Sequence, residues 1–229
     1  MTIPRNLSFL AEGASSTGVL GTANGGTGLN TLGTAGQALV VNSGATGLTY
    51  STPSAGAMTL ISTQTASSSA ISFTNLSGYD KYLLIFDQLA YGNSSGQGAC
   101  LMQFGTGSGP TYITSGYYRQ YTSVNTAGSN SGNFTSGSTN GIPFFASSPT
   151  YTGGYTNGYF FINNMTSGGD VSVFGICNGY HGSPTTNGYE MDTFSGGLPG
   201  NSTTKTAITI FPNAANFISG TASLYGISS

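Results

Sequence analysis

The sequence predicts an all-β protein, and three observations support this prediction. Only 4% of the 229 residues are charged, so the helix formers Glu, Lys and Arg are scarce. Glycine contributes 37 residues and interrupts the chain at short intervals with turn signals. The 14 tyrosines and 13 phenylalanines recur in short segments where apolar and polar residues alternate, the pattern of half-buried strands.

The low charge and the lack of long apolar runs exclude several classes of protein. A net charge of −2 with only four Lys and Arg residues offers no basic surface for nucleic acid. No run approaches the roughly 20 apolar residues of a membrane-spanning helix, so membrane insertion is not expected. The apolar stretch in residues 1–13 is short and interrupted, unlike a signal peptide.

Residues 1–55 are predicted to form an extended arm. Phe9 is the only aromatic residue before Tyr50, and the Leu-Gly-Thr-Ala segment at 20–23 recurs at 32–35. Such a segment buries too little apolar surface to order itself alone. Apolar residues nevertheless recur along it, which predicts burial against copies of the same chain. These residues are Val19, Leu20, Leu29, Leu32, Leu39, Val40, Val41 and Leu48.

Residues 56–229 are predicted to form an antiparallel, jelly-roll-like β-sandwich of about ten strands. Residues 82–86 are apolar at every position, as expected of a central strand. Two polar stretches, 105–116 and 127–141, are predicted to be surface loops, which often carry function on a rigid scaffold. The predicted strands cover residues 58–60, 71–73, 82–86, 100–104, 117–124, 142–146, 159–165, 171–177, 207–211 and 222–227.

The chain has two cysteines, Cys100 and Cys177, each in an apolar strand-like stretch. A disulfide framework shows more cysteines at loop spacing. We therefore expect two buried thiols that pack as small apolar residues, with a bridge between neighbouring strands as the alternative.

The sequence offers few candidate catalytic groups. His181 is the only histidine and lies in a turn-like segment, so no Ser-His-Asp arrangement is indicated. Glu190 and Asp192 would share one face of a strand and are the remaining candidates for paired carboxylates of a glycan hydrolase. A calcium site formed by Asp170, Glu190 and Asp192 would lack the sequence signature of a calcium-binding loop. Asp80 and Asp87 are expected to lie at the ends of a strand. We predict no enzyme, no cofactor and no metal.

Tyrosines amid Asn, Ser and Gly favour recognition over catalysis. Tyrosine gives a large contact area at low entropic cost, while Asn and Ser supply adaptable hydrogen bonds. A sugar ring suits such a surface, although the rings could instead fill the sandwich edge or subunit contacts. The candidates for receptor contact are Tyr112, Tyr117, Tyr118, Tyr151, Tyr155 and Tyr189.

Three segments of the arm resemble the N-terminal part of tail-fibre-like virion proteins of tailed bacteriophages. They are NLSFLA at residues 6–11 with GVL at 18–20, NGGTGL at 24–29, and GQALVVNSGATGLTY at 36–50. NGGTG itself lacks the lysine and the strand-to-helix context of a phosphate loop. The closing residues 220–227, GTASLYGI, are similar to the final strand of β-sandwich knobs on such proteins.

The resemblance implies a homotrimer that attaches to other virion proteins through residues 1–55 and binds a host surface glycan or protein through its C-terminal β domain. The expected function is therefore that of a short trimeric tail fibre in the virion. The chain is short for a long tail fibre, so a head fibre or decoration protein on the capsid is the alternative. Hundreds of copies per virion would favour that alternative, and a glycan hydrolase using Glu190 and Asp192 is the third hypothesis.

Overall fold

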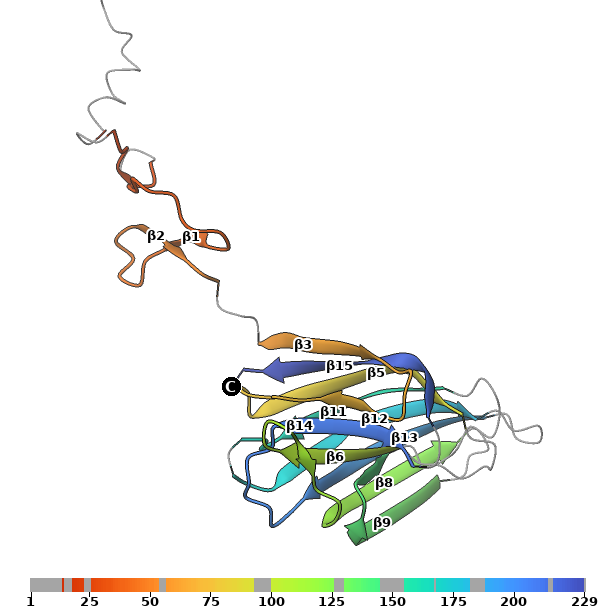
Figure 1. Cartoon of the computed structure of the whole chain (residues 1–229). Helices are drawn as coiled ribbons and strands as arrows, with labels where there is room; N and C mark the ends of the chain where they lie inside the picture. The colour runs from red at the N-terminus through yellow and green to blue at the C-terminus, as the bar shows by residue number, and fades with distance from the viewer. Residues whose placement is uncertain are drawn as a thin grey trace, which may run out of the picture. The chain divides into compact units, whose positions relative to one another are not determined.

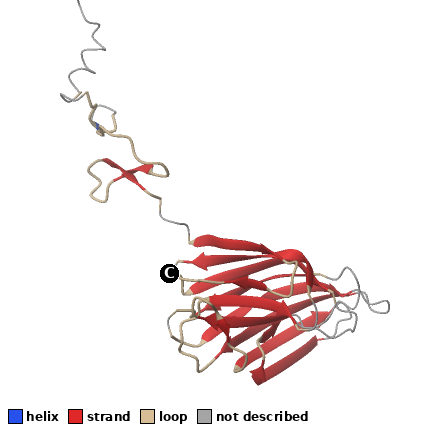
Figure 2. Ribbon diagram, viewed as in Figure 1, coloured by secondary structure: helices blue, strands red, loops and turns tan. Residues whose placement is uncertain are grey.

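The computed structural model describes residues 14, 18–22, 26–53, 57–92, 100–125, 130–144, 155–166, 168–181, 188–213 and 216–228. All fifteen elements in these residues are strands, and every pairing between them is antiparallel (Figure 2). The prediction of an antiparallel all-β protein is therefore confirmed. The jelly-roll likeness stays a prediction.

The chain divides into two compact units, Met1–Ala55 and Gly56–Ser229. In the first unit, β1 (Ala38–Val41) pairs with β2 (Leu48–Ser51) in a hairpin whose turn is closed by a 2.9 Å hydrogen bond from the Asn42 amide to the Gly47 carbonyl. An isolated two-stranded hairpin is marginally stable in water. Leu32 is 92% exposed, and Leu39 and Val41 are also exposed. The single chain thus leaves uncovered several of the apolar residues that the sequence predicts to be buried between copies.

The second unit contains a large sheet of eight strands, in the order β3-β15-β5-β11-β12-β13-β8-β9 (Figure 1). In its middle, β11, β12 and β13 follow one another in the chain and are neighbours in the sheet. The C-terminal strand, β15, lies between β3 and β5. The bounds are β3 Met58–Thr65, β15 Phe217–Ile227, β5 Lys81–Tyr91, β11 Thr156–Asn163, β12 Val171–His181, β13 Gly188–Leu198, β8 Tyr117–Asn125 and β9 Asn130–Thr139.

A smaller sheet of five strands lies against one face of the large sheet (Figure 1). Its order is β10-β6-β14-β4, and the two-residue strand β7 pairs with β6. The bounds are β10 Ile142–Phe144, β6 Cys100–Thr106, β14 Ala207–Pro212, β4 Ile71–Phe73 and β7 Thr111–Tyr112. The buried apolar side chains of both sheets form one core between them.

Four phenylalanines form the centre of this core. The ring of Phe160 on β11 lies 5.3 Å from Phe86 on β5, 5.1 Å from Phe144 on β10 and 5.2 Å from Phe194 on β13, measured between centroids. Phe144 belongs to the small sheet and the other three to the large one. The cluster therefore joins the two layers, with tilted and edge-to-face rings that favour aromatic attraction.

Two glycines inside strands leave the space that these rings occupy. A Cβ on Gly175 of β12 would lie 2.7 Å from a ring atom of Phe160 and 2.0 Å from the Tyr159 carbonyl oxygen. A Cβ on Gly158 of β11 would lie 2.7 Å from the ring of Phe86. Glycine in a strand usually weakens it but marks a close approach, and here it admits the aromatic core.

Three of the sequence predictions on secondary structure were wrong. The predicted loop 105–116 contains the end of β6 and the short strand β7. Residues 130–139 form β9, not a loop, because an edge strand needs only backbone pairing with one neighbour and no apolar alternation. β13, which no predicted strand covered, contains Gly196 and Gly197 and lies between β12 and β8. Asp80 directly precedes β5 as expected, but Asp87 lies inside that strand.

Candidate binding face on the large sheet

The face of the large sheet that points away from the core is the candidate site. Along β5, Tyr82, Leu84 and Phe86 point inward and are buried, so the alternation of a strand turns the residues between them outward. The outward residues are Lys81, Leu83, Ile85 and Asp87. Because the strands pair in known register, the same argument places the outward residues of the neighbouring strands in rows across this face.

Apolar side chains form two adjacent rows on this face. In one row, Leu83 of β5 pairs with Phe161 of β11, and Phe161 pairs with Phe174 of β12. In the other row, Ile85 pairs with Tyr159. The rings of Phe161 and Phe174 stack with centroids 5.0 Å apart, and Tyr159 meets Phe161 edge-to-face at 5.9 Å. We call Leu83, Ile85, Tyr159, Phe161 and Phe174 the apolar stripe.

On β13 and β8, the two rows that start in the apolar stripe continue with polar side chains. The row of Phe174 continues to Ser195 and Gln120, and the row of Ile176 continues to Thr193 and Thr122. These hydroxyl and amide side chains, together with Tyr121 and Phe194, line a shallow hollow of about 310 Å³. Tyr118, 37% exposed, lies on the same face two residues before Gln120 and opposite Gly197, which has no side chain to cover its ring. We call Tyr118, Gln120, Thr122, Thr193 and Ser195 the polar end.

Charge is nearly absent from this face. Among the described residues that point outward from the large sheet, only Lys81 and Asp87 are charged, and both lie on β5. The polar end therefore offers an aromatic ring, hydroxyls and one amide without any ionic group. That combination suits a neutral polyol such as a sugar, whose apolar ring face packs on an aromatic side chain while its hydroxyls exchange hydrogen bonds.

The structure places the six candidate tyrosines in different environments. Tyr118 lies at the polar end, Tyr112 is partly buried in β7, and Tyr155 is partly buried just before β11. Tyr151 lies outside the described residues, and for Tyr189 only its backbone position in β13 is described. Among the candidate tyrosines whose side chains the structure describes, Tyr118 alone lies at the polar end.

Tyr117 is a correction to the sequence prediction. It is fully buried, and its hydroxyl donates to the Ile113 carbonyl and accepts from the Phe104 amide, both at 2.9 Å. Since Tyr117 and Tyr118 are consecutive in β8, only one of them can face outward. Tyr117 therefore cannot contact a receptor and instead ties β8 to β6.

The buried tyrosines predict a loss of stability at alkaline pH. Burial raises the pKa of Tyr117 and of Tyr82 to about 12, from an unfolded value near 10. The stabilisation from each raised pKa is fully present below about pH 10 and is lost as the pH rises towards 12. Tyr117→Phe should remove roughly 1–3 kcal/mol of this pH-dependent loss. Unfolding in guanidinium chloride at a series of pH values between 8 and about 12 measures this loss. If the free energy of unfolding of the variant falls with pH as steeply as that of the wild type, the raised pKa of Tyr117 is contradicted.

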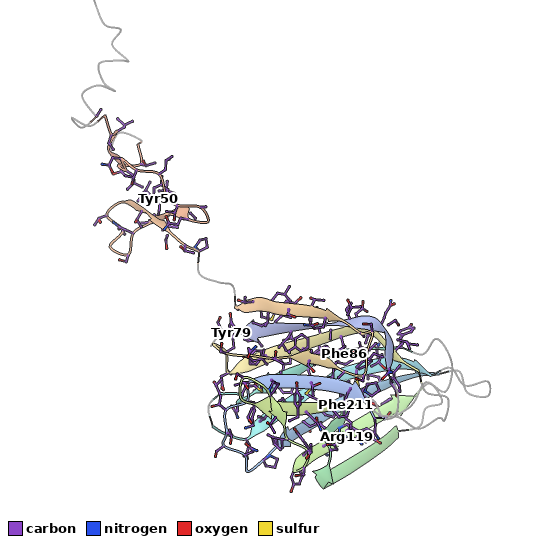
Figure 3. The ribbon with its side chains drawn as sticks, in the orientation of Figure 1. Tyr50, Tyr79, Phe86, Arg119 and Phe211 are labelled. Carbon is purple, nitrogen blue, oxygen red and sulfur yellow. The ribbon has the colours of Figure 1, made fainter. Side chains whose placement is uncertain are left out.

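The carboxylates proposed for hydrolysis do not form a described pair. Asp192 is buried on the inward side of β13, whereas for Glu190 only the backbone, paired with Gly179 and Asn125, is described. The side chain of His181 likewise lies outside the described residues. Inside the sandwich the charge of Asp192 acts on Arg119, which donates from Nη1 to the Pro143 carbonyl at 3.1 Å. Figure 3 labels Arg119 among the strands.

Burial lowers the pKa of the Arg119 guanidinium, while Tyr121 and then Asp192 oppose that shift. The guanidinium carbon lies 4.2 Å from the centroid of the Tyr121 ring, a cation–π contact. Asp192 and Arg119 therefore lie close enough in the core to interact electrostatically.

Asp80, Asp170 and the two cysteines have structural surroundings. Asp80 accepts hydrogen bonds from the Thr166 amide and hydroxyl at 2.8 and 2.9 Å, and Asp170 accepts one from the Gly200 amide at 2.6 Å. Cys100 and Cys177 are buried thiols that form no disulfide, as predicted, and burial with the nearby Cys177 raises the pKa of Cys100 well above its usual value. In the described part of the chain, no three His, Cys, Asp or Glu residues gather as a metal site.

Comparison with protein-family models, with curated protein sequences and with solved structures finds no match to this chain. Within the described residues, no helix is long and apolar enough to cross a membrane.

Proposed function

We propose that this chain is a structural protein of a bacteriophage virion, a short trimeric tail fibre that binds a neutral glycan on the host surface. Residues 1–55 attach it to other virion proteins and hold three copies together, and the polar end of the large sheet contacts the glycan. The observation that carries the proposal is the uncharged polar end, where an exposed tyrosine adjoins a hollow of hydroxyls and an amide.

The N-terminal unit supports the trimer part of the proposal. Its hairpin exposes Leu39 and Val41, and the preceding segment exposes Leu32, so apolar surface remains uncovered in a single chain. Copies of the same segment would cover this surface without needing a further partner. The resemblance of residues 6–50 to the arms of tail-fibre-like proteins points in the same direction.

The polar end differs from the predicted site in its location. Loops were expected to carry recognition, but the described hydroxyls, amide and exposed ring gather on β8 and β13. A sheet face holds its side chains at fixed spacing, so a sugar would meet them without an ordering cost for the backbone.

The glycan proposal predicts a loss of binding in two variants. Tyr118→Ala and Gln120→Ala should each weaken binding to an array of immobilised neutral bacterial oligosaccharides about fivefold, because each removes a ring contact or a hydrogen bond worth roughly 1 kcal/mol. Gln64→Ala is the matched control, since Gln64 is an exposed glutamine on β3, bonded to Ser62 at 3.1 Å and far along the sheet from the polar end.

Salt provides a second readout in the same assay. Binding through hydroxyls and an amide should change little when NaCl is raised tenfold, because no charge at the polar end is available for screening. Preference for acidic oligosaccharides with a steep salt dependence would overturn the glycan proposal, as would equal binding by the wild type and both variants.

A further inference from the structure

The outward side of β5 has an unusual order of side chains. From one end to the other it presents a cation, two aliphatic residues and an anion, namely Lys81, Leu83, Ile85 and Asp87. Six residues of antiparallel strand separate the two charges by about 20 Å. Both charged residues are exposed, and neither makes an ion pair within the part of the chain that the structure describes. Opposite charges thus stand unpaired at the two ends of an apolar segment.

The apolar stripe crosses β5 between these charges. Phe174 is 49% exposed, and Ile85 and Tyr159 are each 39% exposed. Tyr225 on β15 and Leu60 on β3 extend the row of Leu83 to the far edge of the sheet. Together these side chains expose on the order of 500 Å² of apolar surface, near the upper end of what a soluble monomer leaves uncovered. Aromatic and aliphatic residues with charge only at the margin are typical of the core of a protein interface.

The order of charges along β5 identifies a partner that would fit. If a second copy faces this sheet across a two-fold axis that crosses β5 at right angles between Leu83 and Ile85, the two β5 strands run in opposite directions. Lys81 of each copy then lies opposite Asp87 of the other, and the apolar stripes meet between the two pairs. A two-fold axis along β5 would instead place like charges together, which is unfavourable.

We propose that the outward face of the large sheet, centred on β5, is a two-fold interface with a second copy of this chain. An apolar core on the order of 500 Å² with a surrounding rim approaches the ~800 Å² per partner of a standard interface. The inference does not depend on the arm or on a glycan. The polar end lies three and four strands from β5, at the margin of this interface, so the two surfaces are compatible.

Charge exchange in the full-length protein tests the interface. Lys81→Asp places two carboxylates opposite each other, and Asp87→Lys places two ammonium groups opposite each other, so each should raise the dissociation constant of the pair at least tenfold. The double variant Lys81→Asp/Asp87→Lys restores both ion pairs and should return the constant to within about threefold of the wild type. Sedimentation equilibrium measures the constants and the number of chains.

The number of chains separates this inference from the proposed trimer. If the arm holds three chains together and the sheet face pairs with a second copy, the wild type contains six chains and each single variant contains three. If the arm does not form a trimer, the wild type contains two chains and each single variant contains one. A factor of two therefore reports the sheet face, and a multiple of three reports the arm. Because both residues are exposed, circular dichroism should show the same fold in all variants. Single variants with the wild-type number of chains, or a double variant that fails to recover it, would overturn the interface.

Discussion

Phe160→Ala is expected to lower the free energy of unfolding by about 3–5 kcal/mol, the range for removing a buried phenylalanine. Its ring is fully buried and contacts three other phenylalanine rings, one of which belongs to the small sheet. Gly175 lies against this ring, and a glycine has no side chain that could move into the cavity. The loss should therefore fall in the upper part of the range.

Chemical denaturation followed by far-ultraviolet circular dichroism measures this loss, and Tyr118→Ala is the control. Tyr118 is also aromatic and lies in a strand of the same sheet, but it is exposed. Its replacement should change the free energy of unfolding by less than about 1 kcal/mol. Similar losses in the two variants would mean that the phenylalanine cluster is not the centre of the core.

Arg119→Met is expected to lower the free energy of unfolding by about 3–5 kcal/mol, because it leaves the buried carboxylate of Asp192 without its cationic neighbour. The same change removes the hydrogen bond to Pro143 and the contact with the Tyr121 ring. Pro143 is in β10 and Arg119 in β8, so the lost hydrogen bond also joins the two sheets.

The double variant Arg119→Met/Asp192→Asn separates the charge from the packing. Removing both charges avoids an uncompensated ion, so the double variant should be more stable than the sum of the two single losses predicts, by at least about 1 kcal/mol. Denaturation of the four proteins gives this coupling. Additive losses would show that the two groups act independently, and would return Asp192 to consideration as an acid with a role other than stability.

Residues 82–86 show what a sequence pattern predicts about a strand and what it leaves open. Their continuous apolar run predicts a central strand, and β5 is one. The pattern could not say why both faces are apolar. In the structure, Tyr82, Leu84 and Phe86 fill the core, while Leu83 and Ile85 belong to the apolar stripe on the opposite side. Packing against a second layer and packing among neighbours on an uncovered face produce the same apolar pattern in the sequence.

Tyr117 and Tyr118 show where the candidate site escaped prediction. Alternation requires the two rings to lie on opposite faces of β8, but the local sequence does not indicate which of the two rings is buried. The pairing of β8 with β13 and the hydrogen bonds to Phe104 and Ile113 settle that choice. Gln120 and Ser195 were missed for a related reason, since they are 75 positions apart in the chain and become neighbours only through the sheet.

By itself, the sequence determined that the protein is nearly free of charge, and it correctly predicted an all-β protein with two buried thiols, although a bridge between them stayed open until the structure. These properties follow from composition and from alternation within single strands, which are local. Only the tertiary structure decided that β9 and β13 are strands, that Asp192 lies inside beside Arg119, and that an apolar stripe adjoins a polar end on one face. Those outcomes depend on register between segments far apart in the chain, where a shift of one residue would exchange the inner and outer faces.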